Sequence, residues 1–239
     1  MLPRWRLGAL LGFPIYVNVT FLVLLGMAFL WLGGIAGVIA VGVVFASVLL
    51  HELGHAVVAR RRRVAIGGIE LSFLGGAAQM DQLPRSATDE IAIALAGPAV
   101  SVALAGLGLG LGAVTGVEAI TTVGWINLVL AAFNLLPALP MDGGRVLRAL
   151  LSFGTDYARA TEHAVTVARV LAIGLGLLGL AGQVQLLVLA PLLWIMGSRE
   201  RQLARAVGHR FVRTRRGYRE RPPVVMAAPW FVVPRWRAM

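Results

Sequence analysis

The chain has 239 residues, of which 58% are hydrophobic and only 14% are charged, and its mean hydropathy is +0.81. A soluble globular domain carries charge on about a quarter of its residues, so this composition excludes that class and indicates a membrane protein. Because the chain contains no cysteine, disulfides, thiolate metal ligands and a cysteine nucleophile are excluded.

The first apolar run continues through Trp31 and is followed by further apolar runs, without the small-residue cleavage site of a signal peptide. We therefore expect this segment to be retained. A helix needs about 20 residues to cross the hydrocarbon core of a bilayer. The fold expected is an all-α polytopic membrane protein with about six transmembrane helices. The apolar runs place these helices at residues 14–32, 35–59, 89–112, 117–137, 163–181 and 184–198.

The second apolar run contains the sequence VLLHELGHAVVARRRR, residues 48–63. His51 and His55 are four residues apart, so a helix places both rings on one face, where they can bind a single metal ion. Glu52 lies beside them. Ionisable groups inside a spanning helix are costly and are functional by default. We therefore expect a metal site here, rather than histidines that only form hydrogen bonds within a helical bundle.

Residues 64–80, VAIGGIELSFLGGAAQM, partly alternate apolar and polar side chains. This pattern predicts a small membrane-associated β-hairpin after the second helix, with its turn at Gly75 and Gly76. We place the hairpin on the cytoplasmic side. Its edge could bind an extended peptide by strand addition. Alternatively, the hairpin only plugs the helical bundle.

The fourth apolar run ends in NLLPALPMDGGRVLRALL, residues 134–151. Pro137 and Pro140 predict the end of a helix, and the pair Gly143–Gly144 permits positive φ. A catalytic zinc site takes three protein ligands and one water, so a third ligand is needed besides the two histidines. Asp142 is the acidic residue expected at comparable depth, in irregular backbone that is tolerated where it lines a cavity. The alternative is that Asp142 caps the helix that begins near Gly143.

All 22 basic residues are arginine, and the net charge is +11. If the expected spans alternate, every arginine falls on the same side of the membrane. By the positive-inside rule this side is the cytoplasm, and both termini lie there. We expect the arginines to set this orientation and to contact anionic lipid, and we expect no nucleic acid partner. A protein core of residues 1–198 is expected to precede a basic cytoplasmic tail at residues 199–239.

These motifs resemble the site-2 protease family of intramembrane zinc metalloproteases. The resemblance is carried by HELGH at residues 51–55 and by Asn134-x-x-Pro137-x-x-Pro140-x-Asp142-Gly143-Gly144, with weaker support from GFPIYVNVTFLVLL and from ALAGPAVS at residues 94–101. It covers about residues 8–198. It implies His51, His55 and Asp142 as ligands of Zn²⁺ and Glu52 as the catalytic base. It also implies a substrate-facing or oxyanion-facing role for Asn134.

The resemblance implies a zinc-dependent intramembrane endopeptidase of the plasma membrane, active in regulated intramembrane proteolysis. Its expected partners are transmembrane protein substrates and the lipid bilayer. The PDZ and CBS domains of many relatives are not expected, because the expected loops and tail are short. Prenyl-protein peptidases also carry HExxH, but their downstream ExxxD pattern is absent. The alternative function is a membrane transporter, or a catalytically silent scaffold with a structural metal.

Overall fold

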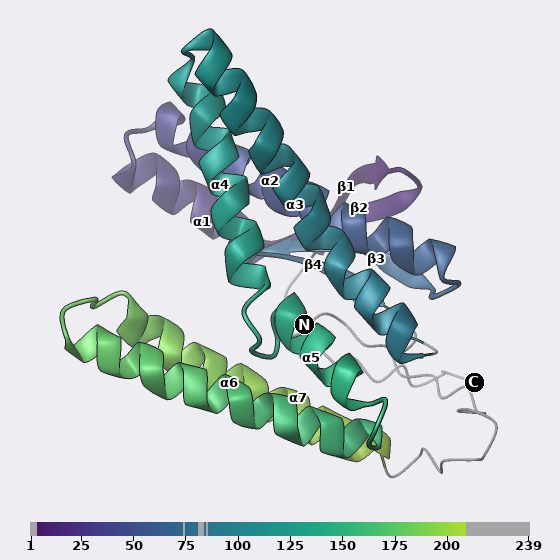
Figure 1. The fold of residues 1–239 in the computed structure, drawn as a ribbon. Coiled ribbons are helices and arrows are strands. Elements are labelled where there is room, and N and C mark those ends of the chain that lie inside the picture. The colour runs from purple at the N-terminus through teal and green to yellow at the C-terminus, as the bar shows by residue number, and fades with distance from the viewer. Residues whose placement is uncertain (1–3, 74, 81–83, 85, 209–239) are drawn as a thin grey trace. The chain divides into compact units, whose positions relative to one another are not determined.

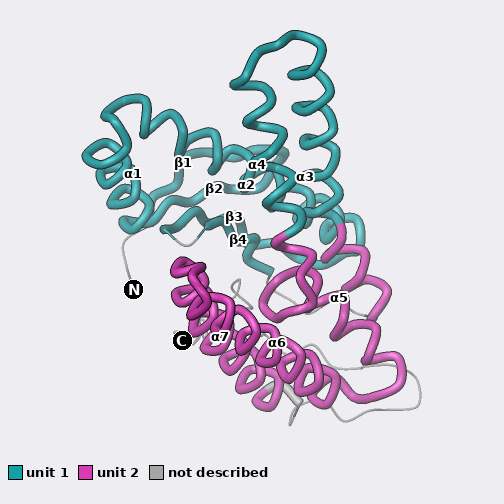
Figure 2. The backbone as a smooth tube through the Cα atoms, turned by 60° about the vertical axis from the view of Figure 1, so that its left-hand side comes forward, with its two compact units in different colours: residues 1–83, 96–132, 224–239 teal, residues 84–95, 133–223 magenta. Residues whose placement is uncertain are grey.

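The computed structural model describes residues 4–73, 75–80, 84 and 86–208, and these form two compact units (Figure 2). The first unit contains the described residues up to 80 together with residues 96–132. The second contains residues 84, 86–95 and 133–208. Figure 1 labels the elements of both units: across the described residues there are seven helices and four strands.

A four-stranded sheet lies in the first unit. Its strands are β1 (Arg4–Leu10), β2 (Phe13–Asn18), β3 (Ile66–Ser72) and β4 (Gly75–Met80), in the order β1-β2-β3-β4. The central pair β2 and β3 is parallel, and both outer pairs are antiparallel. A parallel pair needs a long crossover connection, which two helices supply here. The sequence pattern predicted only the β3–β4 hairpin, so β1 and β2 are additions to the expected fold.

The hairpin turn lies earlier than the sequence suggested. β3 ends at Ser72, which pairs with Gly75, so the turn expected at Gly75 and Gly76 is wrong and both glycines belong to β4. Gly76 serves close packing instead. A Cβ atom there would lie 2.7 Å from Val48 Cγ1 and 3.1 Å from Glu52 Cγ. The missing side chain therefore lets β4 approach the helix that carries the histidines.

The first helix, α1 (Val19–Trp31), begins at an asparagine cap. The side-chain oxygen of Asn18 accepts hydrogen bonds from the backbone N–H groups of Thr20 at 3.0 Å and Phe21 at 3.3 Å, which satisfies two donors of the first helical turn. The helix expected over residues 14–32 is therefore wrong at its start. Residues 14–18 pair with β1 as a strand, and residues 15–17 also pair with β3, so strand pairing outweighs their apolar character.

The second helix, α2 (Ile35–Arg61), packs against the sheet. Five buried apolar residues form this contact, two from the helix and three from the strands: Leu53, Ala56, Phe13, Ile69 and Ala78. The face of α2 that holds Leu53 and Ala56 is thus fixed on the sheet. The site residues of the same helix therefore have a fixed rotation relative to β4.

Helices α3 (Ala87–Thr115) and α4 (Glu118–Asn134) approach each other closely through glycines. A Cβ atom on Gly108 would lie 2.7 Å from the Cα atom of Gly124, so neither position accepts a side chain without movement. Small residues allow helix backbones to meet where apolar side chains alone give no driving force within a membrane. The contact fixes α4 beside the part of α3 that lies in the first unit.

The protein is a membrane protein. Within the part of the chain that the structure describes, three helices are long and apolar enough to cross a bilayer, namely α2, α3 and α6 (Tyr157–Leu180), and α1 is apolar but has only 13 residues. The expected total of six spans stays a prediction, as does the membrane association of the hairpin.

The second unit contains α5 (Asp142–Leu151), α6 and α7 (Leu186–Gly208). Helices α6 and α7 lie side by side in both views (Figures 1 and 2). Because α7 runs through residue 198 without a break, the first ten residues of the expected tail are helical. Residues 209–239 lie outside the described part of the chain, and the division into core and tail stays a prediction.

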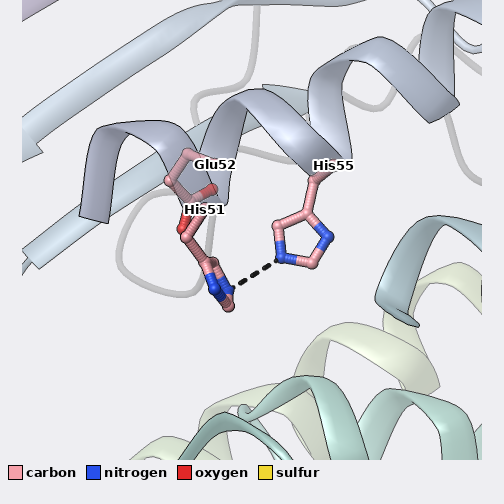
Figure 3. Close-up of side chains that lie close together, drawn as sticks. All are labelled: His51, Glu52 and His55. Atoms are coloured by element: carbon pink, nitrogen blue, oxygen red, sulfur yellow. Dashed lines mark hydrogen bonds between the residues drawn. The ribbon is translucent and has the colours of Figure 1, made fainter. Parts of the chain in front are cut away.

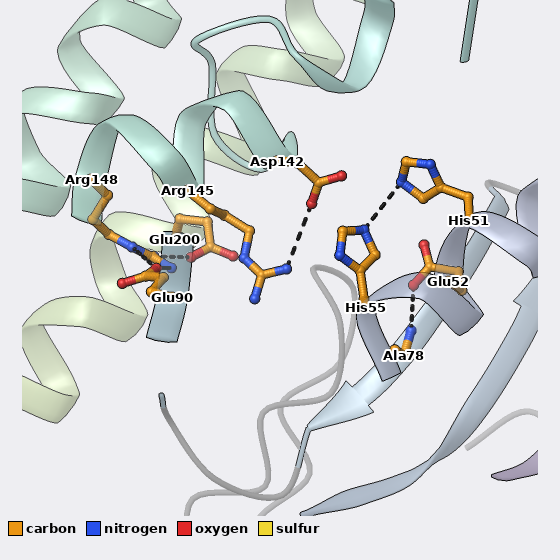
Figure 4. Close-up of polar contacts among 9 residues, drawn as sticks. All are labelled: His51, Glu52, His55, Ala78, Glu90, Asp142, Arg145, Arg148 and Glu200. Atoms are coloured by element: carbon orange, nitrogen blue, oxygen red, sulfur yellow. Dashed lines mark hydrogen bonds and ion pairs between the residues drawn. The ribbon is translucent and has the colours of Figure 1, made fainter. Parts of the chain in front are cut away.

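A buried arginine on α5 contacts residues of three other helices in this unit, α3, α6 and α7 (Figure 4). Arg148 on α5 donates from Nε to Glu90 Oε1 at 2.8 Å and from Nη1 to Glu200 Oε2 at 3.3 Å. Its guanidinium carbon also lies 4.9 Å from the ring centroid of Tyr157. Burial alone would lower the pKa of Arg148, but attraction to Glu90, Tyr157 and Glu200 raises it, so the side chain stays charged. The network fixes α5 within its unit.

Replacing Arg148 with Met should destabilise the protein by about 3–5 kcal/mol, because it leaves two carboxylates without their buried partner. The measurement is denaturant-induced unfolding in detergent, followed by circular dichroism. Arg159→Met is the control: Arg159 is 76% exposed and pairs with Asp156 at the surface, where such a pair contributes about 0–1 kcal/mol. Equal losses in the two variants would contradict a stabilising role for the buried network.

Candidate metal centre

The two histidines of α2 point toward each other from successive turns of the helix (Figure 3). His51 and His55 are buried, at 2% and 3% exposure, and their Nε2 atoms are 3.2 Å apart. This distance allows a hydrogen bond when one nitrogen is protonated. It also matches the roughly 3.3 Å that separates two nitrogen ligands at 2.0–2.1 Å from a tetrahedral zinc ion. The predicted convergence of the two rings is therefore present.

Ser101 on α3 fixes the ring of His51. Its Oγ lies 2.9 Å from His51 Nδ1, and the side chains of both residues are buried. When Nδ1–H donates to this hydroxyl, the lone pair of Nε2 is left for a metal ion. In most metal-binding histidines, the ring nitrogen that does not bind the metal donates a hydrogen bond of this kind, which sets the tautomer and the orientation of the ring. The arrangement of α2 and α3 thus suits a histidine that acts as a ligand.

Gly97, also on α3, leaves the space in which the two ring nitrogens meet. A Cβ atom at this position would lie 2.2 Å from His55 Nε2 and 2.6 Å from His51 Nε2. One helical turn separates Gly97 from Ser101, so the same face of α3 supplies both the space and the hydrogen bond. These contacts show that the donor set and its surroundings fit a metal ion.

A third glycine lies on α2 between the two histidines. A Cβ atom on Gly54 would lie 2.7 Å from the backbone oxygen of Ala96 and 2.9 Å from Val100 Cγ2. The central glycine of HELGH therefore allows α3 to approach α2 closely enough for Gly97 and Ser101 to reach the imidazoles.

Glu52 is half-buried and faces the sheet side of the cluster. Its Oε2 atom accepts a hydrogen bond from the backbone N–H of Ala78 on β4 at 2.8 Å (Figure 4). One ligand-type atom each from His51, Glu52 and His55 lies within 4.8 Å of the others. The carboxylate is therefore close enough to act on a group bound at the two imidazoles.

Asp142 and Asn134 belong to the second unit. Asn134 is the last residue of α4, and Asp142 is the first residue of α5, where it is buried and lies 3.7 Å from Arg145 Nη1. The N-cap position of α5 is occupied by Met141, whose side chain makes no capping hydrogen bond. Asp142 is therefore the first helical residue and not the N-cap that the alternative requires. The roles of Asp142 as a ligand and of Asn134 toward substrate stay predictions.

The glycines after Asp142 act differently from the expectation. Both belong to α5, and neither has a positive φ, so the conformational freedom that the pair permits is not used. A Cβ atom on Gly143 would lie 2.2 Å from the backbone oxygen of Leu135, and one on Gly144 would lie 2.3 Å from the backbone nitrogen of Leu139. Both glycines therefore let the first turn of α5 pack onto the preceding loop, which fixes the backbone that carries Asp142.

Sequence reasoning did not assign functions to Gly97 and Ser101. Both residues lie in the segment ALAGPAVS, which carries only a weak family resemblance in the sequence. Their contacts with α2 depend on how two distant helices pack, and no local pattern in either helix specifies that packing.

The sequence matches the model of peptidase family M50 over residues 39–121 and 113–175. The chain belongs to this family. Its resemblance to site-2 proteases is confirmed by a solved structure, the site-2 protease of Methanocaldococcus jannaschii. That structure has a TM-score of 0.65 and 33% sequence identity, and the match covers 83% of this chain and 95% of the other.

Two curated proteins are similar to this chain in sequence. A zinc metalloprotease of Methanocaldococcus jannaschii is 35% identical over 204 residues, which is 82% of this chain and 59% of the relative. Stage IV sporulation protein FB of Bacillus subtilis is 30% identical over 116 residues, 47% of this chain and 40% of the relative. The chain spans 40–59% of the length of the first curated relatives that it matches.

Replacing Gly97 with Ala should lower the zinc affinity of this M50 protein at least tenfold, because the new methyl group occupies the space between the ring nitrogens. The measurement is zinc competition with a chromophoric chelator on purified protein. Gly106→Ala is a control on the same helix, where an added Cβ meets no atom within 4 Å. Unchanged zinc affinity in Gly97→Ala would show that the metal does not bind at the meeting point of the two rings.

Proposed function

We propose that this protein is a zinc-dependent intramembrane endopeptidase that hydrolyses peptide bonds in or near transmembrane segments of other membrane proteins. The observation that carries the proposal is the convergence of two buried imidazole nitrogens, 3.2 Å apart, with a carboxylate beside them. Membership of peptidase family M50 and the names of the metalloprotease relatives support it.

His51, His55 and Asp142 are the proposed zinc ligands. When bound, zinc would supply Lewis acidity, which lowers the pKa of a water molecule toward about 7 and polarises a carbonyl oxygen. Glu52 accepts the proton of the attacking water and then gives it to the departing amine. Asn134 is the proposed donor to the developing oxyanion.

The hairpin supplies the proposed binding surface for substrate. A peptide bond within a helix is already hydrogen-bonded, so a transmembrane segment must become extended before it can be cleaved. β4 is the last strand of the sheet among the described residues, and it lies beside Glu52. An extended segment can add to such an edge through main-chain hydrogen bonds. This contact with the catalytic carboxylate favours a substrate platform over a plug.

The proposed location is the plasma membrane, with both termini in the cytoplasm. The three apolar helices support a membrane location, and the arginine distribution supports the orientation. The proposed partners are therefore transmembrane substrates and anionic lipid. A role in regulated intramembrane proteolysis follows if these substrates are precursors of signalling proteins.

A transporter or a silent scaffold with a structural metal is the competing function. A structural zinc site is closed by four protein ligands, whereas a catalytic site keeps one position open. The half-buried Glu52 beside the imidazoles favours the catalytic reading, because a structural site needs no base.

Replacing Glu52 with Gln should abolish cleavage, by about 10²–10⁴-fold, while zinc stays bound, because the loss removes proton transfer but no ligand. The assay incubates the purified protein with a panel of synthetic single-span peptides in micelles and identifies the products by mass spectrometry. Glu118→Gln makes the same chemical change at an exposed position on α4 and should leave the rate unchanged. If the wild type cleaves no peptide of the panel, or Glu52→Gln cleaves at the wild-type rate, the proposed mechanism is wrong.

A further inference from the structure

The hydrogen bond between Glu52 and Ala78 uses a donor at the edge of the sheet. Ala78 pairs with Ile69 of β3, but its N–H donates to Glu52 Oε2 at 2.8 Å. In an antiparallel pair, residues whose N–H groups point to the partner alternate with residues whose N–H groups point away. Ala78 therefore presents its N–H on the outer side of β4, and its neighbours Ala77 and Gln79 face β3.

The same outward N–H is the group that an added strand would need. A strand that docks on β4 must place a backbone carbonyl opposite each outward donor. The N–H of Ala78 has one hydrogen, and a charge-assisted bond to a carboxylate is roughly twice as strong as a bond to a neutral acceptor. Glu52 and a docked strand therefore compete for one donor.

Close packing holds Glu52 in this position. Gly76 lies two residues before Ala78, and a Cβ atom on it would come within 3.1 Å of Glu52 Cγ. The carboxylate end is thus bonded to Ala78 while its methylene stem lies over Gly76. Gly76 and Ala78 of β4 thus both contact the side chain of Glu52 on α2. The packing of the helix against the strand therefore holds Glu52 beside the Ala78 N–H.

We propose that the backbone N–H of Ala78 links strand docking to release of the base. Before substrate binds, this N–H holds the Glu52 carboxylate. When an extended segment adds to β4, one of its backbone carbonyls takes the hydrogen bond and frees Glu52 to act as the base. The substrates are then segments that can unwind into a strand with a carbonyl opposite Ala78. The inference rests on the proposed function, and Ala78 is a positioning residue in it.

The test is a binding cycle on the full-length protein in micelles. The probe is a fluorescent acetyl-Val-Ala-Val-Ala-Val-Ala-amide peptide, measured by polarisation at low temperature and shown to be intact by mass spectrometry. Glu52→Leu removes the competing acceptor and should tighten peptide binding about tenfold or more, the factor expected for a hydrogen bond to a charged group. Replacing Ala78 with lactic acid turns the amide into an ester and removes the N–H. In that background Glu52→Leu should change the affinity less than about twofold.

The matched control places lactic acid at Ala77, whose N–H faces β3. There the effect of Glu52→Leu should persist, because the outward donor is intact. Retained zinc in the lactic acid variants checks that the site has folded. If the Ala78 ester does not fold, Ala78→Pro also lacks the N–H, and proline is tolerated on an edge strand whose N–H points outward.

Two outcomes overturn the proposal. The first is an unchanged peptide affinity in Glu52→Leu. The second is an equal gain with and without the Ala78 N–H, which would assign the effect to removal of a charge from the binding surface. Because the cycle measures binding and not turnover, its failure is distinct from a failure of the cleavage assay.

Discussion

The site depends on the packing of α2 against α3 at two buried imidazoles. A helix alone brings His51 and His55 onto one face, but it does not decide whether their nitrogens meet over empty space or over a side chain. Gly97 leaves that space, Ser101 orients the ring of His51, and Gly54 allows the backbones to come close enough for both. Burial of two imidazoles within a membrane protein is costly without partners. The Ser101 hydroxyl supplies one partner, and a zinc ion bound between the nitrogens would supply the other.

The side of α2 that packs on the sheet positions Glu52. Leu53 and Ala56 fix the rotation of the helix on the strands, and this rotation brings Glu52 to the outer side of β4. The proposed metal ligands and the proposed base therefore belong to one helix but contact different elements, α3 for the histidines and β4 for the carboxylate. The edge that can receive an extended chain is consequently in direct contact with the group that would catalyse its hydrolysis.

How far the sequence predicts this arrangement depends on the range of each interaction. The cluster of His51, Glu52 and His55 follows from the helical period and was predictable. The hairpin β3–β4 was predictable from alternation. The parallel pairing of β2 with β3 was not, because α1 and α2 separate these two strands in the chain. The sequence suggests a conformational role for Gly76 and Gly143, whereas in the structure each is required by the close approach of another segment. The sequence alone does not show whether a glycine is required for its backbone conformation or for close packing, since the segment that leaves no room for a Cβ atom can be distant in the chain.

The most direct measurement of the central claim is the zinc K-edge X-ray absorption spectrum of the purified full-length protein. A zinc ion held between the Nε2 atoms of His51 and His55 gives the multiple-scattering pattern of two imidazoles at about 2.0–2.1 Å, completed by oxygen ligands. A spectrum with oxygen neighbours only, or with the scattering of a single imidazole, would contradict the account.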